Sequence, residues 1–303
     1  MKASDISPSK NISFLFKSSP GFGKTLAAAS FAIEGPVYLS YWDKSSPVEL
    51  TTFFTEKRFG KDAKTILDNI EYDVYSSGNP NEYLNKLIDF KQNGCKYFAL
   101  INDSITLMTA ACVNWSLNFG KDKKTTKKFK DVLPQWDEYK VETSLISQCI
   151  DLCKGLPCHS IWTAHPLATV SLSGSGSSIR VERSNSIVSY GSKVASMIPG
   201  SFTEIYHFSQ QSDYSEGVGS KRYIVNTEAV GDEYAKSPLL GDYVKEFDIT
   251  NKLFYRVWKE LIDKSREAAK STEPIEPNSP IPPTKSTEQP TEEPKPSVFK
   301  WKT

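Results

Sequence analysis

Eight consecutive residues near the start of the chain have the types and spacing needed to bind phosphate. They are Ser18, Ser19, Pro20, Gly21, Phe22, Gly23, Lys24 and Thr25. The two glycines allow backbone angles at which N–H groups converge on phosphate oxygens. Lys24 offers a positive charge to the outer phosphates, and the hydroxyl of Thr25 suits a magnesium ion. The stretch therefore predicts a phosphate-binding loop, and the competing interpretation is a chance loop ahead of a buried helix.

The elements on either side of this loop match the context that a P-loop requires. The apolar run 12–16 predicts a strand, and residues 26–33 predict a helix. Strand, glycine-bearing loop, Lys-Thr and helix follow one another in the expected order. The usual motif has a glycine where this chain has Ser18, and the bend at Pro20-Gly21 compensates for that departure.

Three polar residues stand at the ends of predicted strands. The strands are predicted at residues 37–42, 97–101 and 158–164, and Asp43, Asp103 and His165 stand at or just beyond their carboxyl ends. Ligands bind outside the carboxyl ends of strands in open α/β sheets. There Asp103 would hold magnesium, directly or through water, Asp43 would position or deprotonate an attacking water, and His165 would hydrogen-bond the terminal phosphate. Each has an ordinary alternative as a capping or turn residue.

The remaining pattern predicts an α/β fold with a mostly parallel sheet between helices. Further helices are expected at residues 81–92, 104–118, 134–154, 193–198 and 251–269, and further strands at 70–75, 204–208 and 221–226. The last two strands predict an antiparallel hairpin at the sheet edge. We expect a polar lead-in at 1–10, one domain at 11–270 and a disordered tail at 271–303, which is rich in proline, glutamate, serine and threonine. The aromatic and basic end of the tail predicts either a docking peptide or an unselected end.

Two further stretches have the composition of surface loops that could contact nucleic acid. One is a basic run that contains Lys121, Lys123, Lys124, Lys127, Lys128 and Lys130 with a single phenylalanine. It could follow a nucleic-acid backbone, although charge runs are usually solvated surface. The other is the serine- and glycine-rich segment 171–189, which we expect to be a flexible loop and which contains Arg180 and Arg183.

The composition of the whole chain excludes several classes of protein. Its 303 residues include 37 Lys and Arg against 36 Asp and Glu, so it is not a uniformly basic protein. No apolar run approaches the length of a membrane span, and the N-terminus lacks the apolar core of a signal peptide, so a cytoplasmic location is expected. The five cysteines are Cys95, Cys112, Cys149, Cys153 and Cys158. Their spacing favours reduced thiols that pack in a core over a metal site, for which only His159 would be a partner.

The order of these motifs resembles the RecA-like P-loop ATPases, and among them the compact phage group associated with single-strand-annealing recombination. The resemblance covers roughly residues 10–240. It implies that Ser18–Thr25 is the P-loop, that Asp43 takes the place of a catalytic carboxylate that is usually glutamate, and that Asp103 and His165 hold magnesium and sense phosphate. It also implies DNA contacts from two loops, near residues 119–131 and 171–189.

The same resemblance implies an assembly and a set of ligands. In the family, basic residues near the terminal hairpin reach the nucleotide of a neighbouring subunit, and Lys221 and Arg222 are the candidates here. We therefore expect a homo-oligomer, a ring or filament, that uses ATP and Mg²⁺, acts on single-stranded DNA and lies in the host cytoplasm if a phage encodes it. The tail would dock a protein partner.

Three alternatives remain open at this stage. The first is a nucleotide-dependent loader or motor that acts on a protein such as a replicative helicase. The second is a small-molecule kinase, although the chain has no arginine-rich lid. The third is a purely structural nucleotide-binding protein.

Overall fold

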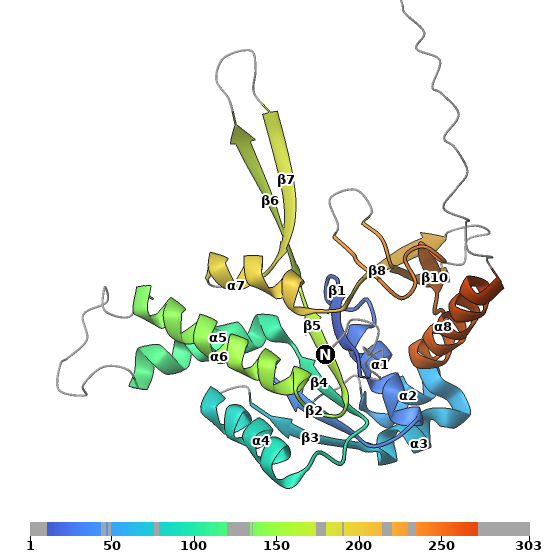
Figure 1. The fold of residues 1–303 in the computed structure, drawn as a ribbon, viewed down its shortest axis with the longest axis horizontal. Helices are drawn as coiled ribbons and strands as arrows, with labels where there is room; N and C mark the ends of the chain where they lie inside the picture. The colour runs from blue at the N-terminus through green and yellow to red at the C-terminus, as the bar shows by residue number, and fades with distance from the viewer. Residues whose placement is uncertain are drawn as a thin grey trace, which may run out of the picture.

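The computed structural model of the chain describes residues 11–43, 47, 50–75, 79–119, 134, 136–173, 180–189, 191–213, 220–229 and 234–271. Within these residues eight strands form one mixed sheet (Figure 1). Across the sheet they are β10 (Glu246–Asp248), β9 (Ser220–Asn226), β8 (Glu204–Asp213), β1 (Ser13–Lys17), β5 (His159–Ala164), β4 (Ala99–Asp103), β2 (Val37–Tyr41) and β3 (Ile70–Val74). All neighbouring pairs from β8 to β3 are parallel. Strand β9 pairs with β8 and with β10, and both of these pairs are antiparallel. The predicted α/β fold is confirmed.

Helices cover both faces of the sheet (Figure 1). The helices are α1 (Lys24–Ala29), α2 (Thr52–Phe59), α3 (Ala63–Asp68), α4 (Pro80–Asn93), α5 (Ile105–Phe119), α6 (Trp136–Lys154), α7 (Ser192–Met197) and α8 (Phe254–Ser271). Short 3-10 helices lie at Ser30–Ile33, Gly60–Asp62 and Ile198–Ser201. Helices α1, α2, α3 and α8 cover one face, and α4, α5 and α6 cover the other.

Alternation along the central strands produces the two cores. In β1, Phe14 and Phe16 enter the core beneath α1 and α8, whereas Leu15 enters the core beneath α5 and α6. Successive side chains of a strand point to opposite faces. Because helices cover both faces, all five residues of β1 are buried, as expected for a central parallel strand.

The core under α8 is unusually aromatic. The ring of Phe254 lies 5.0 Å from that of Phe16, and Trp258 lies 5.3 Å from Phe14. The indole N–H of Trp258 donates to the hydroxyl of Tyr206 at 3.0 Å, and Tyr206 donates to the buried carboxylate of Glu204 at 2.8 Å. Burial raises the pKa of Glu204. Helix α8 is thus packed against β1, which leads into the loop at Ser18–Thr25, and against its neighbour β8.

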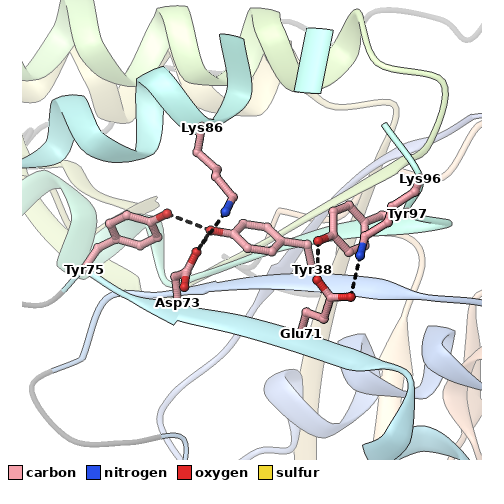
Figure 2. A network of polar contacts seen from close by, with 7 residues as sticks. All are labelled: Tyr38, Glu71, Asp73, Tyr75, Lys86, Lys96 and Tyr97. Atoms are coloured by element: carbon pink, nitrogen blue, oxygen red, sulfur yellow. Dashed lines mark hydrogen bonds and ion pairs between the residues drawn. The ribbon is translucent and has the colours of Figure 1, made fainter. Parts of the chain in front are cut away.

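Strand β3 closes one edge of the sheet with a polar network (Figure 2). The hydroxyl of Tyr38 donates to Asp73 at 2.7 Å and meets that of Tyr75 at 2.6 Å. Lys86 of α4 pairs with Asp73 at 3.5 Å. Further along the strand, Glu71 accepts hydrogen bonds from Lys96 and Tyr97, each at 2.6 Å. Charged and paired side chains of this kind discourage an edge strand from pairing with another chain.

One prediction in the second half of the chain needs correction. Segment 171–189 is not a loop throughout, because β6 (Pro166–Ser173) and β7 (Arg180–Ile187) form an antiparallel hairpin that projects as an arm (Figure 1). The two glycines of the segment fall between the strands, at 174 and 176, whereas four of its serines belong to the strands. The predicted pair β8 and β9 is confirmed, but β10 adds a strand outside it. Strand β10 has only three residues, which are too few for the sequence to show the alternation that predicts a strand.

Several predictions fall on residues outside this description. They are the lead-in 1–10, the lysine run from Lys121 to Lys130, and the tail from residue 272 onward. The domain limits proposed from the sequence stay predictions.

Candidate functional site

The loop between β1 and α1 places its glycines where the backbone requires them. Gly21 and Gly23 have φ angles of 81° and 87°, in the left-handed region that residues with a Cβ adopt at a cost. A Cβ on Gly21 would meet nothing within 4 Å. The requirement is therefore one of backbone conformation and not of space, as expected where N–H groups must turn toward a common ligand.

Lys24 is buried inside this loop, with 5% of its surface exposed. Its Nζ donates to the carbonyl oxygen of Ser18 at 2.8 Å, to the Ser18 hydroxyl at 3.1 Å and to the carbonyl oxygen of Ser19 at 3.1 Å. Burial lowers the pKa of Lys24 to about 8, and the charge of Asp103 opposes that shift. Ser18, which replaces the usual glycine, thus contributes two of the three oxygens that hold the ammonium group.

Asp103 is the last residue of β4 and joins the loop to the sheet. The hydroxyl of Thr25 donates to its Oδ2, and the hydroxyl of Thr163 on β5 donates to its Oδ1, both at 2.5 Å. The peptide bond between Asp103 and Ser104 is cis. A carboxylate and a hydroxyl in direct contact are the hard oxygen ligands that Mg²⁺ prefers, so Thr25 and Asp103 fit a magnesium ion.

His165 follows β5 directly and lies against the same loop. Its backbone N–H donates to the Thr106 hydroxyl on α5 at 3.0 Å, and its Nδ1 lies 3.3 Å from the carbonyl oxygen of Ser18. Because a carbonyl only accepts, the neutral ring would carry its proton on Nδ1. Burial lowers the pKa of His165, as does the charge of Lys24, while the hydrogen bond to Ser18 and the charges of Asp103 and Asp43 oppose the shift.

A cavity of about 370 Å³ brings these groups together. It is lined by Pro20, Gly21, Gly23, Lys24, Thr25, Leu26, Tyr41, Asp43, Arg58, Asp103, Ser104, Leu107, His165 and Tyr223. Asp43 is exposed and lies two residues beyond β2. The structure therefore gathers Asp43, Asp103 and His165 at the carboxyl edge of the sheet, as their strand-end positions predicted, together with Lys24 from the start of α1.

The candidates for DNA and neighbour contacts lie elsewhere. The backbones of Arg180 and Arg183 belong to β7, and their side chains are outside the description. On β9, Lys221 is exposed, and Arg222 forms an ion pair with Asp248 of its own chain at 2.8 Å. Their roles in trans stay predictions.

Three residues of the site were not anticipated from the sequence. Thr163 lies inside a buried strand, and its hydrogen bond to Asp103 depends on the pairing of β4 with β5. Arg58 and Tyr223 reach the cavity from α2 and β9. No local pattern marks them, because they meet the loop only through the fold.

Metal clusters, disulfides and membrane-spanning helices are all absent from the described residues. No cluster of three or more His, Cys, Asp or Glu side chains among them could hold a metal ion. All five cysteines are free thiols; four are buried, and Cys95 is half-buried, in keeping with the predicted core packing. None of the helices in the described part of the chain has both the length and the apolar character to cross a membrane.

The fold and the site together define a P-loop protein of the α/β class. No family model matches the chain, and no curated protein matches it. Among solved structures the chain is similar to the KaiC-like protein PH0186 from Pyrococcus horikoshii OT3, with 12% sequence identity. The match covers 71% of this chain and 77% of that one, with a TM-score of 0.38.

Proposed function

We propose that the chain binds ATP with Mg²⁺, hydrolyses it, and couples hydrolysis to single-stranded DNA, as the resemblance to RecA-like ATPases implies. The observation that carries the proposal is the grouping of Lys24, Thr25 and Asp103 in one cavity beside a glycine loop. Such a grouping suits phosphoryl transfer, in which catalysis is mostly positioning and electrostatic stabilisation.

Each side chain takes the role that its position allows. Bound Mg²⁺–ATP supplies the phosphoanhydride bond and the metal charge. Lys24 holds the outer phosphates, and Thr25 and Asp103 provide oxygen ligands for the metal. Asp43 orients the attacking water and accepts its proton, and His165 hydrogen-bonds the terminal phosphate or this water.

The position of the β6–β7 arm supports coupling to a polymer. Pro166, the first residue of β6, follows His165 directly in the chain. A displacement of His165 would therefore reach the arm through one peptide bond. We propose that Arg180, Arg183 and the lysines of 121–130 contact single-stranded DNA, in phage-type recombination or replication in the host cytoplasm.

We also propose that the chain works as a homo-oligomer, a ring or a filament. In such an assembly Lys221 or Arg222 would approach the nucleotide of a neighbour, and Arg222 would first have to leave Asp248. The tail beyond residue 271 would dock a protein partner.

ATP turnover with and without single-stranded DNA tests the proposal. We expect DNA to stimulate turnover, and Lys24→Ala to reduce it by about 100-fold or more, because the loss is of charge stabilisation in the transition state. Lys140→Ala, which removes an exposed lysine of α6, is the matched control and should leave turnover unchanged. Turnover by Lys24→Ala at the wild-type rate would refute the site. Turnover that ignores DNA but responds to a helicase partner would identify a loader instead.

A further inference from the structure

Two of the five cysteines bring their sulfur atoms together at the edge of the sheet where β4 and β5 begin. The Sγ of Cys95 lies 3.7 Å from the Sγ of Cys158, although 63 positions separate them in the chain. Cys95 belongs to the connection between α4 and β4, and Cys158 directly precedes β5. Because the two strands are parallel neighbours, the pair lies at the opposite edge from the cavity that contains the phosphate loop.

The two sulfurs differ in access from solvent. Cys95 is half-buried, whereas Cys158 is 3% exposed and the other three cysteines are fully buried. Residues 94–97, around Cys95, belong to no helix or strand, whereas Cys158 is anchored by the strand that follows it. A disulfide bond is about 2.05 Å long, so the sulfurs need to approach by only about 1.7 Å more. A reagent in solvent therefore meets Cys95 first, and the segment around Cys95 is the one that can adjust.

The contact also makes the two thiols unequal in acidity. The hydrogen bond between them lowers the pKa of Cys95 to about 7, and the backbone N–H of Tyr97 acts in the same direction against burial. The same hydrogen bond raises the pKa of Cys158, and so does burial. About half of Cys95 is therefore thiolate at neutral pH, while Cys158 keeps its proton. Because the thiolate is the nucleophile, the accessible sulfur is also the reactive one.

We propose that Cys95 and Cys158 form a reversible disulfide site that responds to hydroperoxides. With hydrogen peroxide, the Cys95 thiolate attacks one oxygen, the O–O bond breaks, and the departing hydroxide takes a proton to leave as water; Cys95 becomes a sulfenic acid. The Cys158 sulfur then attacks the Cys95 sulfur, the S–O bond breaks, and the Cys158 proton leaves with the hydroxide as a second water. Two thiols are oxidised and one peroxide is reduced. A dithiol such as dithiothreitol restores both thiols by exchange.

Oxidation of the folded wild-type chain tests the assignment, which does not depend on the proposed function. One equivalent of hydrogen peroxide at pH 7 should lower the number of free thiols, counted in denaturant, from the five of the sequence toward three. Peptide mapping after alkylation should find Cys95 joined to Cys158 within one chain, and dithiothreitol should return the count to five. A count that stays at five, a disulfide that joins any other pair, or oxidation of Cys95 that stops before a disulfide would overturn the assignment.

Matched variants separate the two steps. Cys158→Ala should stop at the Cys95 sulfenic acid, which dimedone traps and mass spectrometry detects, whereas Cys95→Ser should lose the fast reaction with peroxide. Cys112→Ala removes a buried thiol of α5 and should form the same disulfide as wild type. Circular dichroism checks that each variant is folded, and the mapping of the wild-type chain decides the question if one is not. Fast oxidation that persists in Cys95→Ser would also overturn the assignment.

Discussion

The affinity for nucleotide should fall steeply as the pH rises past 8, because Lys24 loses its proton there. Burial sets the pKa of Lys24 at about 8 in the ligand-free chain. A lowered lysine pKa means that the ammonium group is present below that pH and absent above it. Phosphate anions favour the ammonium form and raise its pKa again, so binding above pH 8 must take up a proton.

The magnitude follows from the protonated fraction. For a pKa of about 8 this fraction is about 0.76 at pH 7.5 and about 0.03 at pH 9.5, so affinity should fall about 25-fold over these two units. An ordinary lysine, with a pKa of about 10.4, would change the affinity by only about 1.1-fold over the same range. The two cases are therefore easy to separate.

Isothermal titration calorimetry in buffers of different ionisation heat measures both the affinity for nucleotide and the number of protons taken up on binding. At pH 8.5 about three-quarters of a proton should be taken up for each nucleotide bound. Lys24→Arg should bind with a flat pH profile, since arginine stays protonated throughout. A wild-type affinity that changes less than about twofold between pH 7.5 and 9.5 would refute the reasoning. It would mean that the oxygens of Ser18 and Ser19 outweigh burial in setting the pKa.

Two further perturbations test the core and the thiols. Phe254→Ala should lower the free energy of unfolding by about 3–5 kcal/mol in urea titrations, because the ring is 1% exposed and packs on Phe16; a loss below about 1 kcal/mol would contradict that packing. Cys95, whose sulfur lies 3.7 Å from that of Cys158, should be the fastest thiol to react with iodoacetamide. The hydrogen bond between the two thiols lowers the pKa of Cys95 to about 7, so its thiolate should form at a lower pH than that of an ordinary cysteine. Cys95→Ser should abolish the fast label in mass spectrometry, and a rate that rises only above about pH 8.5 would contradict the shift.

The parts of the site that sequence could predict are those that a local pattern encodes. The phosphate loop is one stretch of eight residues, and Asp103 and His165 stand at or just beyond the ends of buried strands. Such positions meet at one edge whenever the strands are parallel. The sequence therefore predicted the edge and its polar groups, and the cavity contains them.

The parts that sequence missed depend on pairing between distant segments. Thr163 binds Asp103 because β4 and β5 are neighbours, although about sixty residues separate them in the chain. Arg58 and Tyr223 meet across the sheet from α2 and β9, and neither belongs to a motif. In 171–189, small polar residues suggested a loop, but backbone pairing between β6 and β7 determines the structure there.

Ser18, which stands where the usual loop has a glycine, contacts both Lys24 and His165. Its carbonyl oxygen accepts from Lys24 at 2.8 Å and lies 3.3 Å from Nδ1 of His165. When Lys24 turns to a phosphate, this oxygen loses its strongest donor, and its bond to His165 must strengthen or rearrange. His165 is followed by the first residue of the β6–β7 arm. This oxygen thus lies between the loop and the histidine that we propose senses phosphate, and that histidine directly precedes the segment that we propose contacts DNA.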